Sequence, residues 1–305
     1  MPERSATDSG VWKGRAPAKV NLRLRVLERE SDGYHRLETV FQALELADTL
    51  EIALTDQPGI VLEVRGVPDG EIGRPEENLA VRAAVRLVRA VEAGGGRPPG
   101  ISIRLEKAIP HGAGLGGGSS DAAAVLHGVN ALLGAPISRE ELVRMAKELG
   151  ADVPFFVSET SRAIGLGRGD EISPLPPLPR RPLLLVVPAP GIVTGWAYGV
   201  LAAHRILTGE RIAPRSEPDR ASAEDWAGVA RVAGNDFEAA LFPHRPELEQ
   251  LKEVLLEGGA RPALLSGSGS ALFGVFEEEG AATRAAERVG AAFPGARLIL
   301  THTAM

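Results

Sequence analysis

The chain has 305 residues, no cysteine, 44% hydrophobic residues and a formal net charge of −6. A chain of this length can form two domains with separate cores. The lack of cysteine excludes disulfides, thiolate metal sites and a cysteine nucleophile, and the acidic balance argues against a broad nucleic-acid-binding face.

The N-terminal part begins with a polar segment and continues with strand patterns. Residues 1–13 carry acids and no hydrophobic run, which predicts a disordered extension and not a secretory signal. Apolar and alternating runs predict strands, at residues 14–26, 40–44, 48–54 and 60–65. No apolar run approaches the length of a membrane span, so we expect a cytoplasmic protein that does not enter a membrane.

Helix patterns lie on both sides of the most unusual segment of the chain. Residues 78–93 place apolar side chains on one stripe and predict a helix. Residues 138–150 open with a Ser-x-x-Glu capping box, end at a glycine and predict another helix. Between them the run PHGAGLGGGSSD, residues 110–121, follows a strand pattern at 101–107 and opens a helix pattern at 121–133.

This glycine run predicts a phosphate cradle. Its glycines remove the side chains that would keep a ligand from the backbone, and the N–H groups of a helix start attract anions. It is not a P-loop, because no lysine follows its second glycine. The dinucleotide fingerprint, which Gly112, Gly114 and Gly117 meet formally, is a weak match because Pro110 interrupts the strand-to-helix turn.

The second half of the chain mixes strand, helix and loop patterns. A proline cluster at residues 174–179 marks the predicted domain boundary, residues 183–187 predict a buried strand, and residues 208–228 predict a polar loop or insertion. A second small-residue loop, at residues 266–274, would let the backbone approach a ligand closely. The irregular order of strands and helices predicts an α+β fold and not a doubly wound parallel sheet.

Three polar side chains in apolar surroundings are candidates for catalysis or binding. Lys19 and Asn21 share one face of a predicted strand, which suits either a site or an exposed edge. Asp152, in the segment GADVPFF, suits either a carboxylate that accepts a proton or a cap of the turn before Pro154.

The chain is poor in aromatic residues, and two of its segments carry rings with a polar edge. Tyr34 and His35 follow an Asp-Gly turn, and Tyr198 lies in a helix pattern. Each suits either packing or the binding of a planar ring. The six histidines are scattered, and we identify no metal motif.

Six motifs in this order resemble the GHMP kinases, and within them a branch that acts on a cytidine diphosphate alcohol. They are APAKVNL, DGYHRLETVFQ, ENLA, IPHGAGLGGGSSDAAA, GADVPFF and SGSGSALFG, and the resemblance runs from about residue 13 to residue 276. It implies a two-domain GHMP kinase fold. A ribosomal-protein-S5-like N-terminal domain would cover residues 14–176, and a ferredoxin-like C-terminal domain residues 177–305.

The resemblance also implies ATP-dependent phosphorylation of the 2-hydroxyl of a methylerythritol that carries cytidine diphosphate, in the non-mevalonate route to isoprenoids. It makes Lys19 and Asp152 the catalytic pair, in which Lys19 would keep Asp152 ionised. The implied ATP-binding residues are Asn78, Leu79, Pro110, Gly112, Ala113, Gly114, Leu115, Gly116, Gly117, Gly118, Ser119 and Ser120. The implied residues for the cytidine diphosphate part are Asn21, Tyr34, His35, Thr194 and Tyr198.

Two alternatives stay open at this point. One is a GHMP kinase for another alcohol, such as mevalonate or homoserine, and the other is a nucleotide-binding module without catalysis. Mg²⁺ would accompany ATP, but the sequence identifies no protein ligand for it. The expected partner is the small-molecule substrate, with no nucleic acid, and no oligomeric state is indicated.

Overall fold

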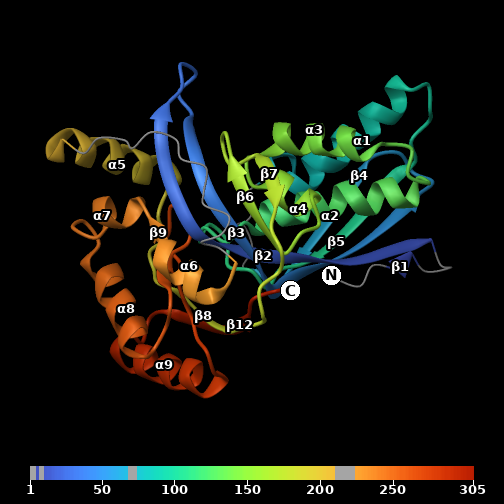
Figure 1. Ribbon diagram of the computed structural model, residues 1–305. Coiled ribbons are helices and arrows are strands. Elements are labelled where there is room, and N and C mark those ends of the chain that lie inside the picture. The colour runs from blue at the N-terminus through green and yellow to red at the C-terminus, as the bar shows by residue number, and fades with distance from the viewer. Residues whose placement is uncertain (1–4, 7–9, 68–73, 210–223) are drawn as a thin grey trace. The chain divides into compact units, whose positions relative to one another are not determined.

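A computed structural model describes residues 5–6, 10–67, 74–209 and 224–305 (Figure 1). The chain divides into two compact units, each assembled from separate stretches of sequence. Unit 1 comprises residues 1–18, 46–111 and 116–160, and unit 2 comprises residues 19–45, 112–115 and 161–305. Much of the predicted extension (residues 1–4 and 7–9) and of the predicted insertion (residues 210–223) lies outside the described residues.

Unit 1 is a sheet with helices on one face (Figure 1). Its strands are β1 (Ser5–Ala6), the first part of β2 (Val11–Arg29), the last part of β3 (His35–Thr55), β4 (Ile60–Arg65) and β5 (Gly100–Glu106). Its helices are the 3-10 turn η1 (Pro75–Glu77), α1 (Leu79–Ala93), α2 (Gly117–Leu132), α3 (Arg139–Leu149) and α4 (Val153–Val157). Strand β5 pairs antiparallel with β3 and parallel with β4.

The alternation of side chains along these strands decides which face the helices cover. Ile52 of β3 and Ile103 of β5 are directly paired and fully buried. Helix α2 packs closely there, since a side chain at Gly128 would collide with Trp12 and Ile52. The neighbouring residue Arg104 points to the opposite, open face and is exposed, as the period of two in a strand requires.

Two strands of the chain are longer than predicted. The patterns at residues 40–44 and 48–54 belong to one strand, β3, because residues 45–47 continue the strand between them. Asp48, at the start of the second run, is buried and paired and does not interrupt the backbone. Strand β2 begins at Val11, before the predicted start, because Trp12 is buried. The predictions of β4, of a helix at residues 78–93 (α1) and of α3 with Ser138 as its cap are confirmed. Asn78 itself caps α1 and does not belong to the helix.

Unit 2 contains a four-stranded antiparallel sheet in the order β10-β11-β8-β12. Its elements after β2 and β3 are β6 (Arg162–Leu166), β7 (Glu171–Pro174), β8 (Pro182–Val187), α5 (Thr194–Thr208), α6 (Trp226–Val232), β9 (Gly234–Asn235), α7 (Phe237–Leu241), α8 (Pro246–Glu257), β10 (Ala263–Leu265), β11 (Leu272–Val275), α9 (Glu279–Ala292) and β12 (Arg297–His302). This strand order and the placement of α8 and α9 against the sheet (Figure 1) form the predicted ferredoxin-like arrangement. Helix α6 lies partly within the predicted polar loop, because Trp226 is buried.

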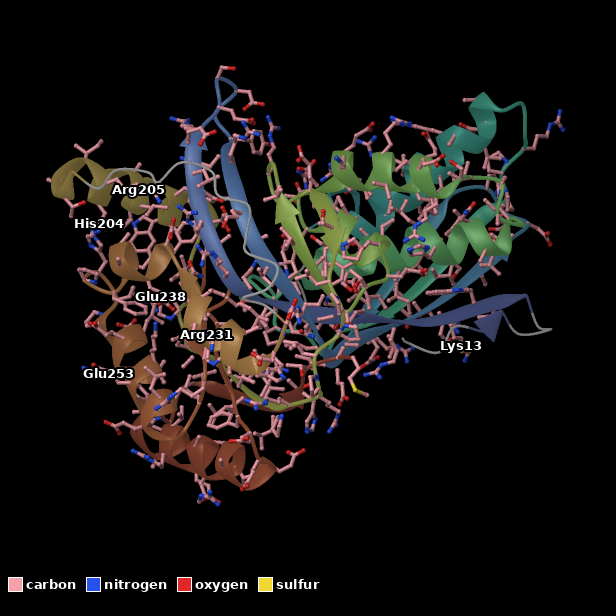
Figure 2. All side chains as sticks on the ribbon, in the orientation of Figure 1. Lys13, His204, Arg205, Arg231, Glu238 and Glu253 are labelled. Atoms are coloured by element: carbon pink, nitrogen blue, oxygen red, sulfur yellow. The ribbon has the colours of Figure 1, made fainter. Side chains whose placement is uncertain are left out.

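The core of unit 2 joins this sheet to the helices around it. Leu184, Leu248 and Phe276 are fully buried in one apolar cluster. Glu238 of α7, labelled in Figure 2, accepts a hydrogen bond from the backbone N–H of Leu265 at 2.8 Å and pairs with Lys252 of α8 at 2.6 Å. Burial raises the pKa of Glu238, against the lowering effect of Lys252. Among the described residues, no helix is long and apolar enough to span a membrane.

Candidate functional site

The glycine run leads into helix α2 earlier than the sequence suggested. The helix begins at Gly117 and not at Asp121, and the N–H of Ser120 already donates to the carbonyl of Gly116 at 2.9 Å. Gly116 precedes the helix with φ 72°, a conformation that glycine adopts without strain. Ser119 and Ser120 therefore lie in the first turn of the helix and not in the loop. Free N–H groups of that turn are available to an anion.

The structure brings the predicted adenine segment next to this helix start. A Cβ atom at Gly118 would lie 3.7 Å from Cδ1 of Leu79. The side chain of Asn78 accepts a hydrogen bond from the N–H of Ala80 at 2.9 Å and so caps α1. Asn78, Leu79 and the helix start are thus neighbours within unit 1.

A buried cluster of charges, which the sequence did not identify, lies beside the same helix start. The Nζ atom of Lys107 donates to Asp48 and, at 2.7 Å, to Asp121. All three side chains are buried. Two features of the sequence could have indicated this cluster: Asp48 is an acid within an apolar strand, and Lys107 directly follows strand β5.

The charges of this cluster influence one another strongly. Burial raises the pKa of Asp121 to about 7, against the lowering effect of Lys107, and Asp48 adds to the rise. Burial alone would lower the pKa of Lys107, but the two carboxylates outweigh it and the pKa is raised. One ammonium therefore pairs with two carboxylates in a buried environment.

Asp152 lies between the end of α3 and the start of α4, also in unit 1. It is half-buried, and the five residues that follow it, Val153–Val157, are all buried. Its carboxylate does not cap α4, so the capping role considered for it is wrong. The turn presents one carboxylate in apolar surroundings.

In unit 2, residues 112–115 of the glycine run lie against the second small-residue loop. A Cβ atom at Gly114 would lie 2.2 Å from the carbonyl oxygen of Ser266, so only glycine fits there. The hydroxyl of Ser266 donates to the carbonyl of Gly114 at 2.9 Å. The backbone of the loop at residues 266–274 thus packs against the glycine run, and its approach to a ligand stays a prediction.

Lys19 and Asn21 lie on one face of β2 in unit 2, as the period of the strand predicts. Both are 2% exposed, so Lys19 is not a solvated edge residue. The Nζ atom of Lys19 donates to Oδ1 of Asn21 at 2.8 Å, and the N–H of Gly267 donates to the same oxygen at 3.0 Å. Asn21 in turn donates to the hydroxyl of Thr39 at 2.8 Å. This network fixes the position of the ammonium group. The part of Thr39 in it was not predicted, because no pattern in the sequence marks that residue.

Tyr34 lies at the tip of the hairpin between β2 and β3, with 62% of its surface exposed. The guanidinium carbon of Arg168 lies 4.4 Å from the centre of its ring. Arg168 also pairs with Glu30 at 2.8 Å and with Asp32. The backbone hydrogen bond from Tyr34 and the contact with Arg168 lower the pKa of Asp32. Tyr34 is thus an exposed ring with one cation against it.

His35 does not stand beside Tyr34 but stacks on Tyr198 of α5, with ring centres 4.9 Å apart. Tyr198 also contacts Phe237 edge-on. Burial, helped by the charges of Arg29 and Arg205, lowers the pKa of His35. At the start of α5 the hydroxyl of Thr194 accepts a hydrogen bond from Ser268, of the second loop, at 3.2 Å. The structure therefore gathers Thr194, Tyr198 and His35 around α5.

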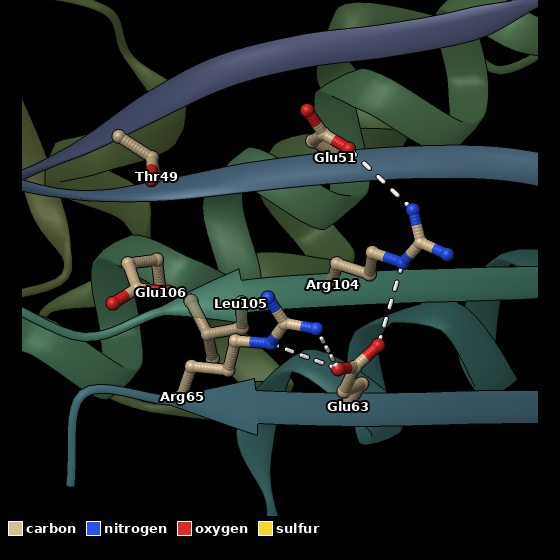
Figure 3. A pocket seen from close by; sticks show the side chains of 7 residues that line it. All are labelled: Thr49, Glu51, Glu63, Arg65, Arg104, Leu105 and Glu106. Atoms are coloured by element: carbon tan, nitrogen blue, oxygen red, sulfur yellow. Dashed lines mark hydrogen bonds and ion pairs between the residues drawn. The ribbon is translucent and has the colours of Figure 1, made fainter.

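The open face of the unit 1 sheet carries a separate shallow groove of about 300 Å³ (Figure 3). None of the predicted site residues lines it. The lining residues are Thr49, Glu51, Glu63, Arg65, Arg104, Leu105 and Glu106. Four of its charged side chains pair with one another, as the dashed lines in Figure 3 show, namely Glu51, Arg104, Glu63 and Arg65. Most of the charge in the groove is therefore already paired.

Comparison with known families gives two matches. The model of the GHMP kinases N terminal domain matches residues 78–160, and that of the GHMP kinases C terminal domain matches residues 219–295. The first match contains the glycine run and Asp152.

Similar sequences and structures extend over nearly the whole chain. A 4-diphosphocytidyl-2-C-methyl-D-erythritol kinase of Geobacter sp. (strain M21) is 44% identical over 278 residues, which cover 90% of this chain and 92% of the relative. The kinase of the same name from Moorella thermoacetica is 42% identical, over 94% of this chain and 97% of the relative.

Solved structures are similar as well. A crystal structure of 4-(cytidine 5'-diphospho)-2C-methyl-D-erythritol kinase superposes with a TM-score of 0.77 at 36% identity and covers 96% of this chain and 99% of that one. A homoserine kinase of Cytophaga hutchinsonii has a TM-score of 0.69 at 18% identity, covering 99% of this chain and 96% of that one, which shows a shared fold alone.

Proposed function

The chain belongs to the 4-diphosphocytidyl-2-C-methyl-D-erythritol kinase family of GHMP kinases, and from this premise we propose how its own residues carry out that reaction. The protein is a phosphotransferase. It transfers the γ-phosphoryl group of ATP to the 2-hydroxyl of 4-(cytidine 5'-diphospho)-2-C-methyl-D-erythritol and releases ADP, a step in the supply of isoprenoid precursors.

We assign the chemical step to Asp152 and Lys19. Asp152 orients the 2-hydroxyl or takes up its proton, which a carboxylate in apolar surroundings can do. Lys19 offsets the negative charge that develops on the transferred group. Its ammonium is buried and fixed by Asn21, and this is the observation that supports the assignment most directly, since an exposed lysine would need no such network.

The phosphates of ATP are assigned to the glycine run and the start of α2. Phosphoryl transfer depends mainly on positioning and charge stabilisation, and a helix start with free N–H groups supplies both. The adenine is assigned to the neighbourhood of Asn78 and Leu79, which lie beside that helix start.

The cytidine diphosphate part is assigned to Asn21, Thr194 and the aromatic side chains of unit 2. Tyr34 offers an exposed ring face for stacking on the cytosine. His35 is neutral near pH 7 because its pKa is lowered, so its ring offers one donor and one acceptor to the edge of the base. Tyr198 holds His35 by stacking and packs beside the base.

Mg²⁺ accompanies ATP in this proposal. Among the described residues no group of three or more His, Cys, Asp or Glu side chains is arranged to hold a metal. The phosphate oxygens of ATP and water would supply most of its ligands, as Mg²⁺ prefers. The cytoplasmic location, the lack of a nucleic-acid partner and the domain boundary at residues 176–177 stay predictions.

The catalytic assignment is tested by Asp152→Asn, measured by ATP consumption with the cytidyl substrate. General-base catalysis contributes on the order of 10²–10⁴ in rate, so kcat falls by that factor while the fold persists. A variant that keeps more than about a tenth of wild-type kcat contradicts the role of Asp152. The matched control is Asp56→Asn, because Asp56 is an exposed acid of the same unit and is not among the assigned residues.

The substrate assignment is tested by Tyr34→Ala. Stacking on a base is worth about 1–3 kcal/mol, so the Kd for the cytidyl substrate rises roughly ten- to a hundredfold while the Kd for ATP barely changes. Calorimetry with each ligand measures both constants. If the variant loses ATP binding and keeps binding of the cytidyl substrate, Tyr34 belongs to the ATP site and the assignment is wrong.

A further inference from the structure

The cluster of Asp48, Lys107 and Asp121 has no role in the reaction described above, yet it adjoins the segment assigned to ATP. Lys107 precedes the glycine run in the chain and Asp121 follows it. Their ion pair, at 2.7 Å, therefore joins the two ends of that segment. A Cβ atom at Gly117 would lie 3.3 Å from the Nζ atom of Lys107, so the cluster lies directly behind the first residue of α2.

Asp48 is the carboxylate of the cluster with the most hydrogen-bond donors around it. Its Oδ1 accepts hydrogen bonds from the N–H groups of Ala108 and Ile109, at 2.6 and 2.9 Å. Its Oδ2 accepts from Lys107. Both oxygens of Asp48 therefore have partners, and one of these partners is the ammonium of Lys107.

Asp121 is the carboxylate that remains. Its Oδ2 accepts from Lys107, but its Oδ1 is buried and has no hydrogen-bond partner among the described residues. Burial raises the pKa of Asp121 to about 7. Lys107 lowers this pKa, and Asp48 raises it further. From the helices packed against α2, no described charged group contributes to this shift.

The charge behind the helix start therefore depends on one proton. With Asp121 protonated, the cluster is neutral. With Asp121 ionised, it carries one net negative charge in a buried site, where charges act over longer distances than in solvent. A negative charge there opposes the attraction of the helix start for phosphate.

We propose that the protonation of Asp121 sets the affinity of the start of α2 for the phosphates of ATP, with tighter binding when Asp121 is protonated. This inference rests on the proposed function, in which that helix start binds ATP. Asp121 is then a positioning residue that acts through the charge of the cluster and touches neither substrate.

The test is the Kd for ATP with Mg²⁺, measured by calorimetry at pH 6, 7 and 8.5, for the wild type and Asp121→Asn. The amide keeps the size of the side chain and an oxygen that accepts from Lys107, but it has no charge at any pH. Between pH 6 and 8.5 the wild-type Kd rises by roughly tenfold more than that of the variant, the effect of about 1.4 kcal/mol of repulsion. The titration of ATP itself is common to both proteins and cancels.

Two further variants secure the interpretation. Asp48→Asn leaves one carboxylate for one ammonium, so its profile is also flatter than that of the wild type and gives a second test if Asp121→Asn does not fold. Asp56→Asn removes an exposed acid of the same unit, and its profile runs parallel to that of the wild type.

Coinciding profiles of the wild type and Asp121→Asn, in an enzyme that binds and uses ATP, overturn this inference alone. A wild type that binds no ATP at any pH overturns the proposed function and this inference with it.

Discussion

Unit 1 contains two groups of paired charges that differ in their exposure to water. The first is the buried cluster of Asp48, Lys107 and Asp121, and the second is a charged ladder on the open face of the same sheet (Figure 3). The ladder consists of Lys13, Glu51, Arg104, Glu63 and Arg65. Strand β3 supplies a carboxylate to each group, three residues apart in the sequence.

The difference lies in what happens when a partner is lost. In the ladder, the side chain of Lys13 is 56% exposed and that of Glu51 is 42% exposed, so water replaces a lost partner. In the cluster, Asp48 is 0% exposed, and water cannot. Exposed ion pairs contribute little to stability, whereas breaking a buried pair leaves an uncompensated charge. Charged residues of the same types in one sheet are thus expected to differ several-fold in their contribution to the free energy of unfolding.

The largest effect is expected from Lys107→Met. It leaves Asp48 and Asp121 buried without a cation, and breaking a buried pair costs about 3–5 kcal/mol. The measurement is the free energy of unfolding from urea denaturation at pH 8. A loss of less than about 1 kcal/mol would mean that water reaches the cluster and that the contrast with the ladder is false.

A pH dependence of stability is expected next. The pKa of Asp121 is about 7 in the folded protein and near 3.8 when unfolded. The unfolded chain therefore releases this proton first, and the contribution of Asp121 to stability is complete below pH 3.8 and is lost as the pH rises to about 7. The slope approaches about 1.4 kcal/mol per pH unit within that window.

Asp121→Asn removes this part of the slope, which unfolding curves of both proteins at pH 4.5, 5.5, 6.5 and 7.5 measure. Other titrating groups affect both proteins alike, so the difference between the two curves isolates Asp121. A constant difference across that range would contradict the raised pKa.

A smaller effect distinguishes two adjacent glycines of α2. A Cβ atom at Gly117 would lie 3.1 Å from Ile109 and 3.3 Å from Lys107, whereas one at Gly118 meets only Leu79 at 3.7 Å. Alanine favours a helix over glycine by roughly 0.5–1 kcal/mol, so Gly118→Ala stabilises the protein. In Gly117→Ala, the tight contacts with Ile109 and Lys107 cancel that gain, and the two variants differ by about 1 kcal/mol in unfolding free energy. Equal unfolding free energies of the two variants would show that the residues around Gly117 accommodate a methyl group.

The smallest effect is expected from Lys13→Met, the counterpart of Lys107→Met in the ladder. Lys13 projects from β2 into solvent, as Figure 2 shows, and pairs with Glu51. Its loss changes the unfolding free energy by no more than about 0.5 kcal/mol, because surface substitutions of this kind rarely do more. An effect above about 2 kcal/mol would place the ladder with the buried cluster and remove the distinction between them.

Local patterns in the sequence were sufficient to predict many helices and strands and to identify several candidate site residues. The stripe at residues 78–93, the capping serine at Ser138 and the alternation at residues 60–65 each predicted an observed element. Lys19 and Asn21 were placed together because a strand has a period of two. The motifs that identified the family are likewise runs of neighbouring residues, which a linear sequence displays directly.

Contacts between distant residues decided the rest. The start of α2 and the continuity of β3 depend on a glycine conformation at Gly116 and on the burial of Asp48, which local propensity does not register. The stacking of His35 on Tyr198 joins residues that are 163 positions apart in the sequence. The cluster of Asp48, Lys107 and Asp121 also depends on such contacts. The sequence shows which residues carry charge, but only the packed fold buries them together and so raises the pKa of Asp121.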